Sequence, residues 1–240
     1  MFDPEIFIRY GGRLFDAFLV TLKLTVLACI AGFFIALLMT SAQMSGSRIL
    51  QRIVSGYVFF FRGTPLLAQA FLIYFGAGQF RSWLEPVGLW FLFRDAYWCG
   101  LIAISLNTGS YTTVLLGGAV QALPRGIIDA CLALGMSRLQ MFRLVVFPLA
   151  FRIAMPAYGN EVILTLKGTA VLSVISVNEL MAQTRLVFSR TFALEIFLVA
   201  GAAYLLTTIL FQRAWRALAR HLNVQEQRET ASKIRSEMLH

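Results

Sequence analysis

Long apolar stretches separated by short polar segments run through the whole chain. Residues 24–47 carry no charge, which predicts a first membrane span over residues 15–42. Residues 96–124 are also uncharged and predict a third span. The other apolar stretches cover residues 53–80, 148–177 and 192–211. Because a helix needs about 20 apolar residues to cross a bilayer, the pattern predicts an all-α integral membrane protein with about five transmembrane helices.

The composition narrows the class of protein further. Of the 240 residues, 58% are apolar and 14% are charged, and the mean hydropathy is +0.73. A soluble domain contains about 45–50% apolar and about 25% charged residues. These values exclude a disordered chain, a coiled coil and almost any water-soluble enzyme. We expect one membrane domain over residues 1–222, followed by a polar tail over residues 223–240.

The charge distribution predicts an orientation. The net charge of +9 is spread between the apolar stretches without a run of five basic residues, so we expect no nucleic-acid partner. With the N-terminus outside, thirteen basic residues, Arg62 among them, fall on the cytoplasmic side and six fall outside. The positive-inside rule therefore favours an N-out, C-in topology.

Three arginines follow the last apolar stretch, at positions 213, 216 and 220. We expect a helix to leave the membrane here and to place them near the inner lipid headgroups. Anchoring by extended basic side chains is the simpler interpretation. A dedicated site for membrane lipid is the second.

The second apolar stretch is interrupted by Arg62-Gly63-Thr64-Pro65. A broken helix leaves carbonyl groups unpaired, which membrane proteins tolerate where the chain faces protein or a water-filled cavity. The hydroxyl of Thr64 and the amide of Gln69 could bind the polar ends of a small solute, or they could repair the broken helix. Asn107, in the middle of the third stretch, could line the same cavity or join two helices.

Glu161 is the most informative polar residue within the apolar stretches. A carboxylate inside a membrane is costly and needs a partner or a function. It could pair with Arg62 or Lys167, or remain protonated at a helix contact. It could instead receive the guanidinium or ammonium end of a cationic amino acid.

Residues 124–148 predict two short helices joined by a glycine corner. Pro124 suits a helix start, Gly135 a helix end and Ser137 a second helix start. Pro148 should limit how far the second helix continues. That helix would carry three apolar side chains on one face: Leu139, Phe142 and Val146. From these residues alone, an amphipathic connector on the membrane surface is as plausible as a docking element.

This segment resembles the coupling motif of ABC-importer permeases. That motif contains an acidic-Ala-Ala triplet, a following glycine and a terminal Leu-Pro, for which this chain has Asp129-Ala130-Cys131, Gly135 and Phe147-Pro148. Asp, Cys and Phe replace the usual Glu, second Ala and Leu. The resemblance implies that residues 125–147 dock into the ATPase subunit and transmit its motion. Asp129, near the start of the first helix, should also interact favourably with the helix dipole.

Three further motifs resemble polar amino-acid permeases: residues 61–66 with Gln69 and Tyr74, residues 106–112, and residues 152–169. The resemblance covers residues 12–222 and is closest to the histidine, lysine-arginine-ornithine and octopine/nopaline type. Residues 94–99 also look like the octopine/nopaline branch. It implies a type I ABC-importer permease fold and transport of a polar solute, a basic amino acid or an opine in particular. It also assigns substrate contact to Glu161, in line with the argument from its charge.

The resemblance implies several partners. The chain has no Gly-x-x-x-x-Gly-Lys-[Ser/Thr] motif, so ATP and Mg²⁺ should bind a separate ATPase homodimer. A second permease, expected to be a paralogue, and a periplasmic binding protein should complete a complex in the bacterial inner membrane. Three separated cysteines and two histidines in the tail indicate no metal site and no cofactor in this chain.

Two other functions are compatible with parts of the pattern. A membrane-embedded serine protease could use Ser105 or Ser110, with Lys167 as the base because both histidines lie in the tail. A stand-alone carrier is the other alternative, but the chain shows no internal repeat and a carrier would not explain the segment at residues 125–147.

Overall fold

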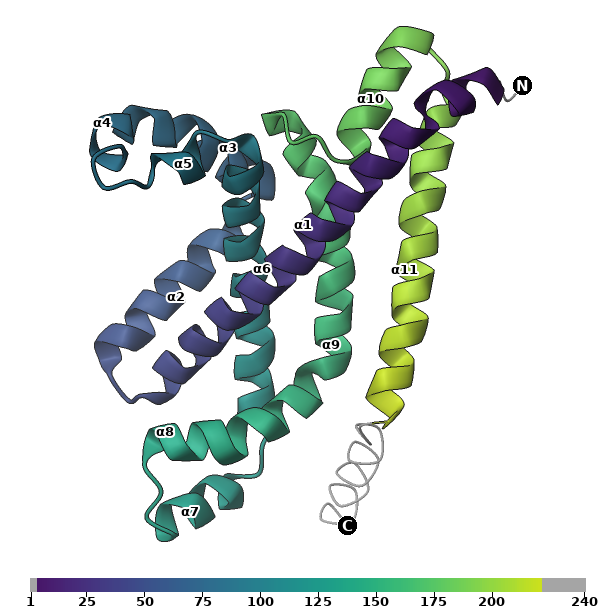
Figure 1. The fold of residues 1–240 in the computed structure, drawn as a ribbon. Coiled ribbons are helices and arrows are strands. Elements are labelled where there is room, and N and C mark those ends of the chain that lie inside the picture. Colours follow the sequence, from purple (N-terminus) through teal and green to yellow (C-terminus); the bar gives the residue numbers. More distant parts are fainter. Residues whose placement is uncertain (1–3, 222–240) are drawn as a thin grey trace.

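The computed structural model describes residues 4–221, and four long helices form its main bundle: α1 (Pro4–Met44), α6 (Ala96–Gln121), α9 (Phe147–Gly168) and α11 (Glu195–His221). Each of the four lies in a segment long and apolar enough to cross a membrane. Two shorter helices, α2 (Arg48–Gly63) and α3 (Leu66–Ala77), form a broken apolar segment that gives a fifth span when the bent pair is counted as one. The bend between Arg48–Gly63 and Leu66–Leu84 is 106°. The start of α1 and the end of α11 lie at opposite ends of the bundle (Figure 1). The expected all-α fold with about five spans is confirmed.

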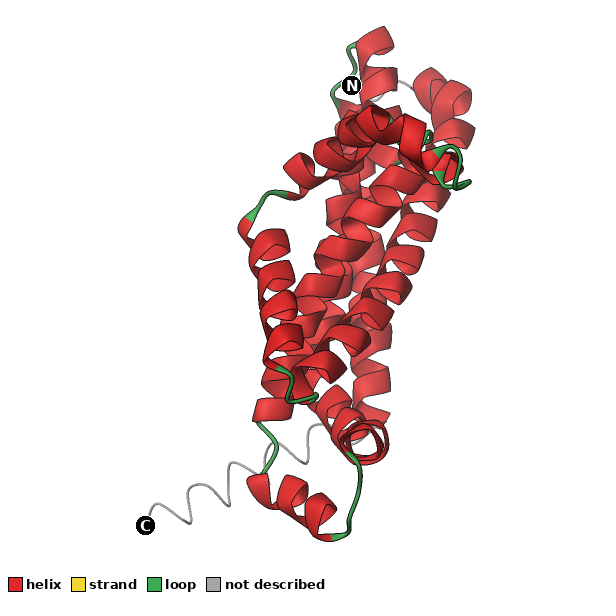
Figure 2. Ribbon diagram, turned by 90° about the vertical axis from the view of Figure 1, so that its left-hand side faces the viewer, coloured by secondary structure: helices red, strands yellow, loops and turns green. Residues whose placement is uncertain are grey.

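Short helices occupy the two ends of the bundle. At one end lie η1 (Gly78–Phe80), α4 (Arg81–Leu84), α5 (Trp90–Phe93) and α10 (Leu180–Thr191). At the other end lie α7 (Arg125–Ala133) and α8 (Arg138–Met141), in the region predicted to couple to an ATPase (Figure 1). Short loops connect many of the elements (Figure 2), whereas α3, η1 and α4 follow one another without a loop. The sequence analysis assigned no element to α10, whose polar residues interrupt the apolar pattern.

The second short helix and the fourth span are joined by a disturbed helical segment just before Pro148. The chain stays helical from α8 through a π-helical segment, η2 (Phe142–Val146), into α9. Pro148 is only the second residue of α9, and the preceding turn is already wide, with the Phe147 N–H donating to the Phe142 carbonyl. A π turn interrupts the regular hydrogen-bond ladder, so a proline without an N–H is tolerated beside it. Helix α8 is therefore continuous with α9, the helix of the fourth span.

Helices α1 and α6 approach each other closely. A Cβ atom added to Gly32 would lie 2.5 Å from Thr108 Cγ2 and 3.0 Å from the Gly109 nitrogen. Small residues at such a crossing allow two membrane helices to pack backbone to backbone. This packing fixes Thr108 in the interior of the bundle.

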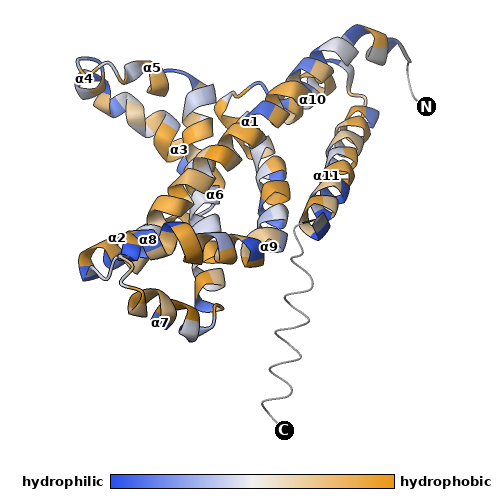
Figure 3. Ribbon diagram, turned by 60° about the horizontal axis from the view of Figure 1, so that its bottom comes forward, coloured by the Kyte–Doolittle hydropathy of each residue, from blue (hydrophilic) through white to orange (hydrophobic). Residues whose placement is uncertain are grey.

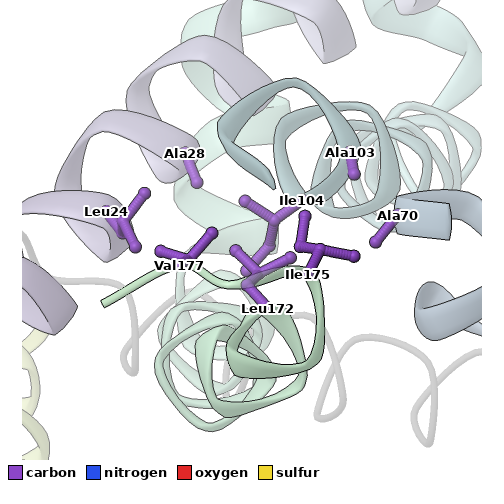
Figure 4. Close-up of a cluster of buried hydrophobic side chains, with 8 residues drawn as sticks. All are labelled: Leu24, Ala28, Ala70, Ala103, Ile104, Leu172, Ile175 and Val177. Carbon is purple, nitrogen blue, oxygen red and sulfur yellow. The ribbon is translucent and has the colours of Figure 1, made fainter. Parts of the chain in front are cut away.

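A buried apolar cluster joins α1, α3, α6 and the chain after α9. Its members are Leu24, Ala28, Ala70, Ala103, Ile104, Leu172, Ile175 and Val177 (Figure 4). Leu172 and Ile175 belong to η3 (Thr169–Ile175), which extends the fourth span. The cluster holds α3 against α6, while the outer surfaces of α1 and α11 remain largely apolar (Figure 3).

Candidate functional site

The break between α2 and α3 is capped by the side chains around it. Thr64 Oγ1 donates to the Phe60 carbonyl at 2.8 Å, and Pro65, which follows, has no N–H to donate. Gln69 is 2% exposed, and its Nε2 lies 2.9 Å from the Phe61 carbonyl, 3.0 Å from the Thr64 carbonyl and 2.8 Å from Thr64 Oγ1. The freed carbonyls are thus satisfied from within the chain.

Asn107 of α6 completes this arrangement. Its Nδ2 donates to Gln69 Oε1 at 3.0 Å and lies 3.1 Å from the Phe61 carbonyl. We call Thr64, Gln69 and Asn107 the break cluster. The Arg62 guanidinium takes no part in this arrangement; it lies over the Tyr111 ring, 5.1 Å from the centroid. The break is therefore held by neutral amides and a hydroxyl.

Glu161 of α9 is 7% exposed and is held by two threonines. Its Oε1 accepts a hydrogen bond from Thr108 Oγ1 at 2.9 Å, and Thr165 Oγ1 lies 3.0 Å from Thr108 Oγ1. Thr165 Oγ1 also lies 2.9 Å from the Glu161 carbonyl. We call these three residues the Glu161 cluster. Within residues 4–221, no Lys or Arg nitrogen lies within 4 Å of this carboxylate, so a direct ion pair with Arg62 or Lys167, one of the alternatives considered, is not formed.

The two clusters meet at one cavity of about 210 Å³. Its lining residues are Leu66, Ile104, Asn107, Tyr111, Glu161, Leu164, Thr165 and Gly168. Glu161 and Asn107 therefore face the same space. Thr64 and Gln69 do not line it, and they reach it only through the hydrogen bond from Asn107.

The glycine corner after α7 forms as expected. Gly135 has a φ of +70°, and its N–H donates to the Leu132 carbonyl at 2.9 Å, while the Met136 N–H donates to the Cys131 carbonyl at 3.1 Å. These two bonds define a Schellman cap. Ser137 then begins α8 in a capping box with Gln140.

The three residues of the coupling triplet are not all on the surface. Asp129 and Ala130 are exposed, whereas Cys131 is 5% exposed and packs in a cluster with Met141 and Phe142. Asp129 is the fifth residue of α7, beyond the first turn, so the expected dipole stabilisation is weak.

The buried face predicted for the second short helix is only partly correct. Phe142 and Val146 are buried, but Leu139 is 70% exposed. Together with Leu132 and Leu134, which are 54% and 80% exposed, it adds apolar area to the outer surface of the segment.

Sequence reasoning missed three residues that organise the interior. Thr108 and Thr165 bind Glu161, but single threonines in an apolar stretch give no signal. Glu179, fully buried, caps α10: its carboxylate accepts from the Ala182 N–H at 2.7 Å and from the Tyr204 hydroxyl at 3.0 Å. Burial raises the pKa of the Glu179 carboxyl above its usual value, although these hydrogen bonds oppose the shift.

The described residues offer no support for metal or protease chemistry. Residues 4–221 contain no group of three or more His, Cys, Asp or Glu side chains that could hold a metal ion. Ser110 Oγ donates to the Asn107 carbonyl at 2.7 Å, and Lys167 is exposed near the end of α9. No Ser–Lys hydrogen bond is found in this part of the chain.

Comparison with known proteins gives consistent matches. The family model described as "Binding-protein-dependent transport system inner membrane component" matches residues 28–224. The nopaline transport system permease protein NocM of Agrobacterium fabrum is 40% identical over 212 residues, covering 88% of each chain. The arginine ABC transporter permease protein ArtM of Haemophilus influenzae is 39% identical, covering 78% of this chain and 82% of its own.

A solved structure shares the fold. The crystal structure of an amino acid ABC transporter with histidines matches with a TM-score of 0.78 and 30% identity, covering 92% of this chain and 99% of the other. The family match spans both the Glu161 and the coupling regions. This chain therefore belongs to the binding-protein-dependent transport system inner membrane components, the permease subunits of ABC importers.

Proposed function

We propose that this permease imports a cationic amino acid or an opine with a cationic group, and that Glu161 receives that group. The observation that carries the proposal is a carboxylate that lines a cavity with no cation within 4 Å among the described residues. A guanidinium would supply the missing charge and could form two hydrogen bonds with it. The relatives named for arginine and nopaline transport support the same class of solute.

The cavity suits one end of such a solute. Asn107 would contact the solute beside Glu161, and the apolar Leu66 and Leu164 line the same space. Thr64 and Gln69, which we expected to bind substrate directly, would instead support Asn107 from behind. The second permease, proposed to be a paralogue, would enclose the rest of the solute.

The proposed solute class is tested by uptake into vesicles that contain the reconstituted complex and ATP. We expect arginine or an opine to be taken up, and glutamine, similar in polarity but neutral, to compete weakly. Uptake of glutamine in preference to arginine would refute the cationic specificity without affecting the assignment to the permease family.

We further propose that residues 125–147 dock onto a separate ATPase homodimer, which would bind ATP and Mg²⁺. The homodimer would drive the permease between outward-open and inward-open states. Exposed Asp129 and Ala130, with the apolar Leu132 and Leu134, form a surface suited to a protein cleft. The rigid corner at Gly135 would convert motion of that surface into motion of α9. A periplasmic binding protein would deliver the solute at the opposite end.

The proposed orientation is N-out and C-in. Arg62 lies fourteen residues along α2 from Arg48, or about 20 Å into the bundle, so it does not count toward either side. The remaining distribution, twelve basic residues against six, still favours this orientation.

A cysteine introduced at Ser82 should react with an impermeant thiol reagent from outside the cell, and a cysteine at Ser137 should not. Both serines are exposed, and α4 and α8 lie at opposite ends of the bundle. The parent chain, in which Cys99 and Cys131 are buried, is the control. Labelling of Ser137→Cys but not of Ser82→Cys would indicate the opposite, N-in topology.

A further inference from the structure

A second pocket, distinct from the Glu161 cavity, lies between α9 and α11. The end of α11, which lines it, lies at the same end of the bundle as α7 and α8 (Figure 1). The volume of this pocket is about 360 Å³. Its polar wall consists of Asn160, Gln212 and Arg216, and Pro156, Gly159 and Trp215 form its base. Neither the substrate path nor the coupling segment uses these residues.

The base of this pocket is rigid. A Cβ atom added to Gly159 would lie 2.3 Å from the Trp215 ring, so the indole packs directly on the backbone of α9. The indole N–H donates to the Met155 carbonyl at 2.9 Å, and the ring stacks on Phe211 with centroids 5.4 Å apart. Such an aromatic side chain, with one polar contact and one apolar face, is typical of the membrane–water interface.

The pocket also carries positive charge that no acidic group of residues 4–221 pairs with. Arg216 is exposed, its Nε donates to the Gln212 carbonyl at 3.2 Å, and no carboxylate of residues 4–221 lies within 4 Å of it. Arg152, also exposed, precedes Pro156 by four residues and so lies one helical turn away on the same face of α9. Basic pockets between transmembrane helices suit the phosphate of a lipid headgroup.

An apolar track continues from the pocket along α11. Ile209 and Leu205 precede Arg216 by seven and eleven residues, which places them on the same helix face. They are 38% and 61% exposed. We propose that this pocket binds an anionic phospholipid, with its phosphate between Arg216 and Arg152 and an acyl chain along Ile209 and Leu205.

The test is native mass spectrometry of the full-length chain, purified with its co-purifying subunits and supplied with phosphatidylglycerol or phosphatidylcholine. We expect the parent to retain phosphatidylglycerol in preference to phosphatidylcholine. Arg216→Gln should weaken that retention about fivefold, since one arginine contributes about 1 kcal/mol at an anionic surface. Arg213→Gln, on the same helix but outside the pocket lining, is the matched control and should have little effect.

Several outcomes would overturn the proposal. Equal retention of the two lipids by the parent would do so whether or not the variants fold. Equal losses in Arg216→Gln and Arg213→Gln would indicate general attraction to the surface. Competition by glycerol 3-phosphate as strong as by the intact lipid would indicate a site for free phosphate. Loss of the second permease from Arg216→Gln, with lipid retention unchanged, would identify a subunit contact instead.

Discussion

The helical chain is interrupted at two places, and the backbone carbonyls that each interruption leaves free are satisfied in different ways. At Gly63–Pro65, in the break between α2 and α3, the freed carbonyls are bound by side chains, with Gln69 from α3 and Asn107 from α6. At Gly135, near the end of the bundle, two backbone N–H groups close the last turn of α7, and no side chain takes part. The carbonyls at the break between α2 and α3 are bound by polar side chains from two helices, whereas the corner after α7 needs only one glycine.

The difference follows from access to water. At the end of the bundle, carbonyls left by a cap can be hydrated, so a local backbone motif is sufficient. Within a membrane-spanning segment, where no water is available, an unpaired carbonyl costs several kcal/mol, so polar side chains are needed to satisfy it. Thr64 and Gln69 are therefore committed to the fold, which leaves Glu161, with Asn107 beside it, as the polar groups that line the cavity.

Of the substitutions at these two places, Gly135→Pro is expected to have the largest effect on uptake. Proline fixes φ near −65° and has no N–H, so it can neither adopt the +70° of this residue nor donate to the Leu132 carbonyl. The cost is about 3 kcal/mol or more, localised at the corner. We expect uptake to fall to background while the chain still inserts into the membrane.

Gly135→Asn is the matched control, because asparagine tolerates the left-handed conformation and no atom lies within 4 Å of the position of an added Cβ. It should retain most of the uptake. Normal ATPase pull-down and normal uptake by Gly135→Pro would contradict a coupling role for the corner.

A smaller effect is expected from Gln69→Leu. Removing the amide leaves the Thr64 carbonyl and the Asn107 amide without this partner. The expected cost is about 1–3 kcal/mol of folding stability, measured as a lower thermal midpoint of the purified complex. The ratio of arginine to glutamine uptake should not change, since Gln69 does not line the cavity.

Gln51→Leu is the control for this variant. Gln51 is exposed and donates a single hydrogen bond to the Gln43 carbonyl, so its loss should leave the midpoint nearly unchanged. If Gln69→Leu is as stable as the parent but selects solutes differently, the break cluster belongs to the substrate site.

The spans were predictable because they depend on local composition alone. The same holds for the caps at Gly135 and Ser137, which depend on one or two neighbouring residues. Helix α10 was missed because its sequence is polar, and its position depends on Glu179 reaching Tyr204 of α11. The π turn before Pro148 was not predicted, because the sequence offers no signal for it.

The site was predictable to the extent that its residues are costly in a membrane. Glu161 and Asn107 stand out in apolar stretches, and the structure places both at one cavity. Thr108 became a partner of Glu161 through the close crossing at Gly32, a tertiary contact that the sequence pattern does not reveal. The burial of Cys131 also depends on packing against Met141 and Phe142.

The central claim is that the Glu161 charge selects a cationic solute, and Glu161→Gln tests it most directly. This variant keeps the volume and most of the hydrogen bonding of the side chain and removes its charge, so a bound guanidinium would be left unpaired at a cost of about 3–5 kcal/mol. We expect arginine to bind and enter at least about a hundredfold less effectively, with little change for glutamine. Glu85→Gln, which removes an exposed charge paired with Arg81, should transport arginine normally. Arginine uptake by Glu161→Gln at the parent rate would contradict the claim and leave Glu161 a structural carboxylate.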